Sequence, residues 1–269
     1  MSDKKVFVVD VARCSGCFNC QLACKDEHCG NDWPPYAKPQ PDTGQFWLKL
    51  EQNERGTIPK VRVHYIPRLC RHCDDAPCMA AAPEAVYRRP DALVIIDPEK
   101  AAGNDKLVES CPFGAIYWNE DLKLAQKCTG CAHLLDAGQT PRCVDACPTD
   151  ALIFGTEDEL RELIAQAKPE AGARGSHVYY LNVPGRFIAG TVYDPIEKEV
   201  VIGAVCRLKA AGKEWTATSD EYGDFWFTDL EEQGDYELAI ESPGFHTKSF
   251  SKLSAKDDLN LGDIPLARK

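Results

Sequence analysis

The chain has 269 residues, 44% of them hydrophobic, and a net charge of −11. Its length predicts two domains. An acidic chain without a basic tract disfavours binding to nucleic acid or to an anionic membrane, because both need a positively charged face. No apolar run reaches the roughly 18 residues of a membrane span, and the start, MSDKKVFVVD, shows no secretory signal. We therefore expect a protein of a reducing, cytoplasmic compartment without a membrane span.

Short strand patterns alternate with cysteine-rich segments in the first part of the chain. A helix is expected over 156–167, because Thr156 and Glu159 fit a capping box and apolar residues then recur on one face. Residues 168–176, KPEAGARGS, are typical of a linker. Strands are expected over 5–13, 45–52, 60–66 and 92–97.

The second part of the chain has a different pattern, in which short apolar–polar alternations are separated by turn residues. This pattern predicts a β-sandwich or small barrel of about 85 residues. Thirteen of the fourteen cysteines lie between Cys14 and Cys147, so composition also marks a boundary. We expect a cysteine-rich domain over 1–175 and a β-sandwich over 184–269. Its strands are expected over 186–194, 200–209, 213–219, 224–230, 235–242, 246–253 and 259–266.

Two complete cysteine motifs stand at the ends of the cysteine-rich domain. Motif one has the C-x2-C-x2-C-x3-C spacing that bacterial ferredoxins use, in which three cysteines bind one 4Fe–4S cluster and the fourth binds its neighbour. It comprises Cys14, Cys17, Cys20 and Cys24. Motif four keeps the C-x2-C start and the C-x3-C-P end around a longer middle. It comprises Cys128, Cys131, Cys143 and Cys147.

Two incomplete motifs lie between them. Motif two has Cys70, Cys73 and Cys78, but Ala82 stands at its fourth position, before Pro83. Motif three keeps only its last cysteine, Cys111, before Pro112. Its first three positions hold Ala101, Asn104 and Leu107. If these motifs exchange fourth ligands, one site is complete and the other has lost all four ligands. The simplest interpretation is that one cluster was deleted and three were kept.

The exchange rule predicts three 4Fe–4S sites with twelve iron-binding cysteines. Site 1 comprises Cys14, Cys17, Cys20 and Cys147. Site 2 comprises Cys24, Cys128, Cys131 and Cys143. Site 3 comprises Cys70, Cys73, Cys78 and Cys111. Zinc ribbons also use C-x2-C pairs, but zinc does not explain the three-cysteine run or the C-x3-C-P endings, and a reducing compartment disfavours disulfides.

Residues outside these sets are given plainer roles. Cys29 is expected to be a spare thiol in a loop, and Cys206 a buried structural cysteine in a strand. His72, between Cys70 and Cys73, is expected either behind the ligands or in solvent. We find no nucleophile–base pair, P-loop or dinucleotide fingerprint, so no catalytic residue is assigned. The expectation for His72 also applies to His28 and His133, and packing roles are expected for Trp33, Trp47 and Trp118.

The cysteine segments resemble the iron–sulfur subunits of molybdopterin oxidoreductases of the dimethyl-sulfoxide-reductase family. The resemblance covers about residues 5–155 and rests on CSGCFNCQLAC, CRHCDDAPC, ESCPFGAIYWN, KCTGCAHLLD and CVDACP. It implies an α+β fold with a nested bacterial-ferredoxin-like 4Fe–4S domain. The tail from Gly185 resembles carboxypeptidase-regulatory or transthyretin-like domains, which are all-β, Ig-like sandwiches. Many family members carry four clusters, and this sequence departs from them at Ala82, Ala101, Asn104 and Leu107.

The resemblance also implies a partner and a role. The partner is a large catalytic subunit that binds molybdopterin with molybdenum or tungsten, in a heterodimer or a multiple of it. A three-cluster subunit with a β-domain resembles those of transhydroxylases, hydroxylases and dehydroxylases of polyhydroxylated aromatic rings. This chain would then transfer electrons without catalysing the reaction itself. A free polyferredoxin-type carrier shares the ligands but gives the β-domain no role, and a zinc-bearing interaction module is a third alternative.

Overall fold

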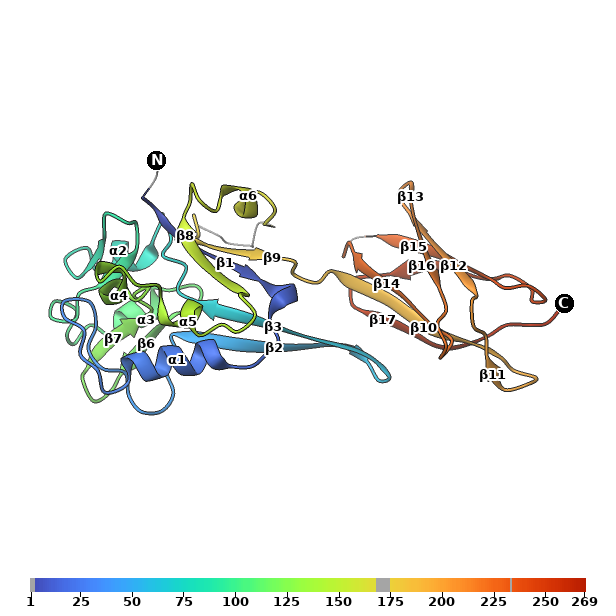
Figure 1. Cartoon of the computed structure of the whole chain (residues 1–269), viewed down its shortest axis with the longest axis horizontal. Coiled ribbons are helices and arrows are strands. Elements are labelled where there is room, and N and C mark those ends of the chain that lie inside the picture. The colour runs from blue at the N-terminus through green and yellow to red at the C-terminus, as the bar shows by residue number, and fades with distance from the viewer. Residues whose placement is uncertain (1–2, 168–174, 233) are drawn as a thin grey trace. The chain divides into compact units, whose positions relative to one another are not determined.

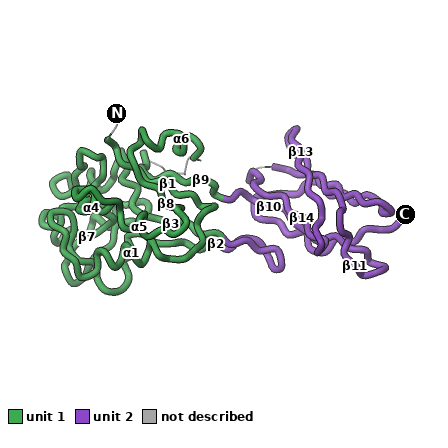
Figure 2. Tube along the Cα trace, viewed as in Figure 1, with its two compact units in different colours: residues 1–53, 64–183 green, residues 54–63, 184–269 purple. Residues whose placement is uncertain are grey.

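The computed structural model describes residues 3–167, 175–232 and 234–269, and its chain divides into two units (Figure 1, Figure 2). Unit 1 comprises Met1–Asn53 and His64–Val183. Unit 2 comprises Glu54–Val63 and Pro184–Lys269. Most of the predicted linker, residues 168–174, lies outside the described residues. The second unit thus includes a short segment that the sequence pattern alone does not connect with it.

A three-stranded sheet joins the two ends of unit 1. Its central strand β1 (Lys5–Asp10) pairs antiparallel with β8 (Leu152–Thr156) and parallel with β9 (Val178–Leu181). The apolar run from Val6 to Val9 is at most 1% exposed, as expected for a strand with both faces covered. Motif one follows β1 and motif four precedes β8, so this pairing brings the two motifs to the same end of the sheet.

Three hairpins and several short helices also belong to unit 1, except that the tip of the first hairpin, residues 54–63, belongs to unit 2. The hairpins are β2–β3 (Leu48–Thr57, Lys60–Leu69), β4–β5 (Val86–Arg88, Val94–Ile96) and β6–β7 (Ile116–Asn119, Leu124–Lys127). The helices are η1 (Val11–Arg13), α1 (Asn19–His28), α2 (Pro77–Ala81), α3 (Lys106–Glu109), α4 (Ala132–Asp136), α5 (Arg142–Asp145) and α6 (Arg161–Ile164).

Several predicted elements end differently in the structure, and for two of them the contacts show why. The strand expected over 5–13 stops at Asp10, whose carboxylate accepts a hydrogen bond from the Ala12 amide and so starts η1. The helix expected over 156–167 was predicted too long. Its capping box forms in both directions, from the Thr156 amide to Glu159 Oε2 at 2.7 Å and from the Glu159 amide to Thr156 Oγ1 at 3.2 Å. However, Thr156 is still paired with Lys5 in the sheet, and turns fill the residues before α6.

Unit 2 is a sandwich of two four-stranded sheets, as its alternating pattern predicts. One sheet has the order β11-β10-β14, with β17 on β10, and the other has the order β13-β12-β15-β16. Buried side chains alternate along β14 and β15, where Phe225, Phe227 and Leu238 belong to one hydrophobic core. The strands are β10 (Arg186–Asp194), β11 (Glu199–Val200), β12 (Val205–Ala210), β13 (Lys213–Thr218), β14 (Asp224–Leu230), β15 (Asp235–Glu241), β16 (Lys248–Ser254) and β17 (Leu259–Pro265).

The tip of the β2–β3 hairpin is fixed within unit 2 by one arginine. The Arg55 guanidinium binds Asp258 through two hydrogen bonds, of 2.6 and 2.7 Å. It also donates to the carbonyl oxygens of Pro184 at 2.9 Å and Gly185 at 2.6 Å. The Asp258 side chain is only 3% exposed and accepts a further bond from the Phe187 amide. Removing the arginine would therefore leave a buried carboxylate without its counter-ion.

We predict that Arg55→Ala lowers the unfolding free energy of unit 2 by about 3 kcal/mol, because breaking a buried ion pair leaves an uncompensated charge. Native-state hydrogen exchange of the β10 and β17 amides would measure it. The control is Lys213→Ala, whose pair with Glu231 is 64% and 72% exposed and which should cost less than about 0.5 kcal/mol. Equal effects of the two substitutions would contradict the prediction.

Candidate iron–sulfur sites

Site 1 forms at the junction of motifs one and four. Its cysteines come from the loop after η1, from α1 and from the turn after α5. All four line one cavity, together with Phe18, Leu50 and Pro148. Cys17 is exposed and Cys20 is buried, whereas the other two are half-buried. The structure therefore brings this predicted set together, and it is the one set of the three with an exposed cysteine. The set is Cys14, Cys17, Cys20 and Cys147.

Site 3 is built in the same way from motifs two and three. Two of its cysteines lie in the loop between β3 and α2, one lies on α2, and the fourth follows α3. All four line a second cavity. Three are buried and Cys111 is half-buried. The set is Cys70, Cys73, Cys78 and Cys111.

Site 2 has the most buried cysteines. Cys24 comes from α1 and Cys143 from α5, two helices that pack against each other, while the other two lie between β7 and α4. The four thiols lie close enough together for ionisation of one to raise the pKa of another. Burial raises the pKa of Cys128 to about 11 and that of Cys131 to about 12. Thiols of this kind ionise when they bind iron rather than in the free protein.

The donor chemistry of the three sites fits iron–sulfur clusters. Thiolates are the ligands that hold such clusters, and backbone N–H groups aimed at sulfur tune them. The amides of Ala115, Gly130 and Ala151 donate to the sulfurs of Cys111 at 3.4 Å, Cys128 at 3.3 Å and Cys147 at 3.3 Å, one in each site. Within residues 3–167, 175–232 and 234–269, no three His, Cys, Asp or Glu side chains are grouped around a single-ion position.

A shared backbone conformation wraps the first two cysteines of each run. The second residue after the first cysteine has a positive φ in all three, namely Gly16 at 73°, His72 at 46° and Gly130 at 65°. Glycine suits this conformation, and at Gly16 a Cβ atom would also lie 2.5 Å from the Tyr65 ring. His72 is held there because the Val94 amide donates to its Nδ1 at 3.0 Å.

Site 2 is adjacent to both other sites. Cys128 and Cys143 of site 2 belong to one buried core, which also includes Cys20 of site 1 and Cys70 of site 3. Tyr117 lies near both Cys24 of site 2 and Cys111 of site 3, since burial and these two thiols raise the pKa of its hydroxyl. Site 2 is therefore the neighbour of both other sites in this part of the fold.

Apolar side chains occupy three of the four positions of the fourth set. Ala82 and Ala101 are 0% exposed and Leu107 is 1% exposed, and all three pack in one hydrophobic cluster with residues such as Ile116. Asn104 is half-buried, and its amide donates to the Ala101 carbonyl. None of these four side chains is a thiolate, so this part of the fold is packed core rather than a cluster wall.

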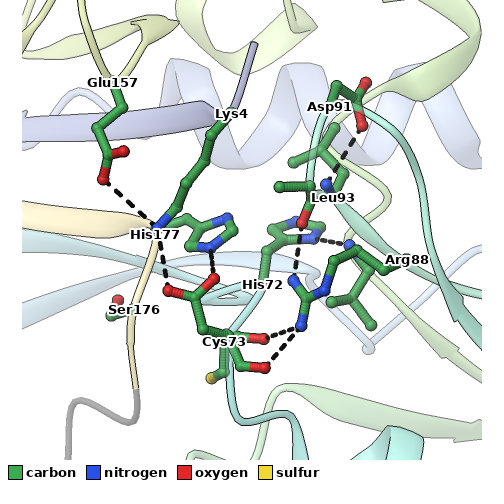
Figure 3. A network of polar contacts seen from close by, with 12 residues as sticks. Lys4, His72, Cys73, Arg88, Asp91, Leu93, Glu157, Ser176 and His177 are labelled. Atoms are coloured by element: carbon green, nitrogen blue, oxygen red, sulfur yellow. Dashed lines mark hydrogen bonds and ion pairs between the residues drawn. The ribbon is translucent and has the colours of Figure 1, made fainter. Parts of the chain in front are cut away.

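A polar network holds the Cys73 loop of site 3 (Figure 3). Arg88 donates to the carbonyl oxygens of Cys73 at 2.7 Å and Asp74 at 2.8 Å. The Asp74 carboxylate pairs with His177 Nε2 at 2.8 Å and Lys4 Nζ at 3.0 Å. Burial lowers the pKa of His177, although Asp74 opposes this. Arg88 and His177 come from β4 and from the residue before β9, and no sequence motif marks either of them, so sequence reasoning missed their roles.

His28 and His72 are buried and the His133 side chain is only 9% exposed, so the solvated one of the two expectations for these three histidines is corrected. His72 is 1% exposed, and His28 is 2% exposed with its Nε2 4.0 Å from Cys131 Sγ. Burial lowers the pKa of His28 to about 3, so its ring is neutral. His133 pairs with Glu27 at 3.0 Å and stacks on Trp33 at 4.2 Å.

The remaining tryptophans and cysteines take the expected places. Trp47 is 2% exposed and packs against His28, and Trp118 packs beside the hydrophobic cluster that includes Leu107. Cys206 is fully buried in β12, and burial raises its pKa to about 12. Cys29 caps the end of α1, and its thiol donates to Asp42 at 3.3 Å. Neither cysteine lines the cavities of sites 1 and 3.

Three groups of four cysteines on short ferredoxin-type loops define a class of multi-cluster electron-transfer protein. The 4Fe–4S dicluster domain family matches residues 61–157, and the carboxypeptidase regulatory-like domain family matches residues 188–267. The predicted fold class, a ferredoxin-like domain followed by an all-β sandwich, is thereby confirmed.

Similar proteins identify the family more closely. The small subunit of pyrogallol hydroxytransferase from Pelobacter acidigallici is 40% identical, over 96% of this chain and 98% of its own length. The iron–sulfur subunit of an arsenate respiratory reductase from Shewanella is 30% identical, over 65% and 94%. The B subunit of the anaerobic dimethyl sulfoxide reductase of Escherichia coli is 34% identical, over 60% and 78%.

The chain belongs to the iron–sulfur subunits of the molybdopterin oxidoreductases of the dimethyl-sulfoxide-reductase family. It is thus an electron-transfer subunit with 4Fe–4S clusters and a molybdopterin-containing catalytic partner, as the resemblance implied. Among the described residues, no helix has both the length and the hydropathy needed to cross a bilayer.

We predict that Leu107→Ala lowers the unfolding free energy of unit 1 by about 3 kcal/mol through a core cavity, while iron content stays unchanged. Chemical denaturation and an iron assay would measure the two effects. Leu122→Ala, at a position 45% exposed, is the control and should cost less than about 0.5 kcal/mol. Loss of iron from the Leu107 variant would mean that this side chain supports a cluster.

Proposed function

We propose that this chain carries three 4Fe–4S clusters, one at each of sites 1, 2 and 3, and passes electrons to and from a large molybdopterin subunit. The observation that carries the proposal is the convergence of cysteines from distant motifs into three sets of four. The apolar packing of Ala82, Ala101 and Leu107 supports three clusters rather than four.

The chain's own residues hold and shield the clusters, and each cluster when bound exchanges one electron. Buried thiols and backbone N–H donors set how easily each site accepts an electron. The position of site 2 beside both other sites supports a route along the unit. Site 1, with its exposed Cys17, is the site most open to a partner.

We propose that the partner acts on polyhydroxylated aromatic compounds and adds, removes or moves a ring hydroxyl. The pyrogallol hydroxytransferase small subunit aligns with nearly the whole chain, including the sandwich. The arsenate and dimethyl sulfoxide reductase subunits align with 65% and 60% of it. The extent of the alignment therefore favours the hydroxytransferase type. Molybdenum and tungsten both suit such a partner.

The domain limits and the compartment form part of the proposal. We place the cluster domain at 1–175 and the sandwich at 184–269, with the sandwich as a docking or stabilising surface for the heterodimer. We propose a reducing, cytoplasmic setting because the cysteine spacing is that of cluster ligands rather than of a disulfide framework.

Metal analysis of the tagged protein, purified anaerobically from its native host, tests this function. We expect about twelve iron atoms per chain, together with a large subunit that contains molybdenum or tungsten. The same iron without a partner would favour a free polyferredoxin-type carrier. Zinc in place of iron would overturn both interpretations.

We predict that Cys111→Ser lowers iron by about one third, because it removes a ligand from one of three sites. Iron assay and cluster absorbance would measure the loss. Cys206→Ser and Cys29→Ser are the matched controls and should keep full iron. Equal iron in the Cys111 variant and in the controls would remove Cys111 from the ligand set.

A further inference from the structure

Lys127, the last residue of β7, is a buried cation at site 3. It lines the site 3 cavity and is 3% exposed. Its ammonium donates to the carbonyl oxygens of Val94 and Cys128, the latter at 3.1 Å. Across the described residues, no carboxylate pairs with it. Burying a charge without a counter-ion is costly, so an anion bound in the cavity would stabilise this lysine.

Two more residues that line the same cavity carry N–H donors. Arg71 lines it, with its guanidinium carbon 3.6 Å from the ring centroid of Phe113, which is another lining residue. His72 also lines it, and its Nδ1 accepts the Val94 hydrogen bond, so the proton of the neutral ring is on Nε2. That Nε2 is buried and has no hydrogen-bond partner among the described residues. Figure 3 shows His72 next to the Cys73 loop that Arg88 holds.

The cavity of site 1 lacks such groups. Its lining residues, all of them described, include no charged side chain. Arg13 precedes Cys14 in the sequence, and Asp150 follows Thr149, another lining residue. These two side chains pair with each other at 3.4 Å and are 47% and 82% exposed. Solvent screens a pair of that kind. Site 1 therefore has no buried positive charge to favour an added electron.

Site 2 is intermediate between them. The Lys127 ammonium opposes the rise in pKa that burial causes for Cys128 of site 2, as it does for Cys78 of site 3. At Cys131, however, Glu27 and Arg142 act in opposite directions. Their ion pair, at 2.8 Å, leaves little net charge on that side of site 2.

We propose that site 3 has the highest midpoint potential of the three sites, so that electrons accumulate there, and that Lys127 is the main positioned charge that sets this order. Reduction adds one negative charge to a site, and a nearby buried cation stabilises it. An electron that moves from site 1 to site 3 oxidises the first and reduces the second. The inference rests on the proposed function, since it assumes a cluster at each site.

The order of potentials can be tested without changing Lys127. The protein, purified anaerobically with its partner, is titrated with reductant while the cluster signals are followed by electron paramagnetic resonance. The signal that Cys111→Ser abolishes or alters identifies site 3. We expect this signal to have the most positive midpoint. A more positive midpoint at either other site would overturn the inference, whereas low iron in the unmodified protein would instead overturn the proposed function.

The role of Lys127 has its own test. Lys127→Gln should lower the site 3 midpoint by at least the 59 mV that a tenfold change in a one-electron equilibrium represents. Site 1 should not shift. Lys127→Arg keeps the charge and should keep most of the potential. Lys123→Gln is the surface control, since Lys123 precedes β7 and is 62% exposed.

Unchanged midpoints in a Lys127→Gln variant with full iron would remove Lys127 from the explanation. If the Lys127→Gln variant loses the site 3 cluster, the role of Lys127 is tested by comparing the site 3 midpoint of Lys127→Arg with that of the unmodified protein. A site 3 midpoint in the Arg variant close to the original supports a role of charge. A site 3 midpoint that falls by the equivalent of a tenfold change, despite the retained charge, contradicts it.

Discussion

The structure of unit 1 depends on one constraint, which is that each set of four cysteines draws its members from two distant motifs. Cys147 joins Cys14 at site 1, and Cys24 joins Cys143 at site 2. Motifs one and four can meet only if the two ends of the domain are adjacent. The pairing of β1 with β8 and the packing of α1 on α5 provide this. The short sheet and helices hold the cysteine-bearing loops in place. Buried cysteines form part of the hydrophobic core of this unit.

Electrostatics impose a second constraint, because a chain with a net charge of −11 has to hold further negative charge in its interior. Backbone N–H groups on sulfur supply part of the compensation at every site. Buried side chains with a full positive charge are fewer than these backbone N–H donors. Where Lys127 is buried, it bonds to carbonyl oxygens rather than to a carboxylate, so its charge is not cancelled within the protein. A buried cation placed in this way distinguishes one site from another.

The cavities of sites 1 and 3 are lined by the cysteine sets that spacing and the exchange of the fourth ligand group together, and iron binding by these sets stays a prediction. The sandwich strands were also predictable from their two-residue alternation. By contrast, the contacts of Arg55, Arg88 and His177 each depend on a single side chain that meets a distant backbone segment or side chain. Such contacts leave no periodic pattern in a sequence. The predicted length of α6 was wrong for a related reason. The capping box is a local contact that the sequence shows, whereas the pairing of Thr156 with Lys5 joins distant residues.

Three of the four positions that depart from the four-cluster pattern, Ala82, Ala101 and Leu107, are apolar rather than merely non-ligating. A site that lost some thiols but kept its cavity would leave buried thiols and amides without partners, which is costly. Ala82, Ala101 and Leu107 instead close the volume, and their cluster also includes Cys73, Cys78 and Cys111 of site 3. This packing makes site 3 the last site on its side of the unit. In the proposed three-cluster arrangement, an electron that reaches site 3 would have no further cluster to enter there, and a charge that stabilises the reduced state would hold it at this position.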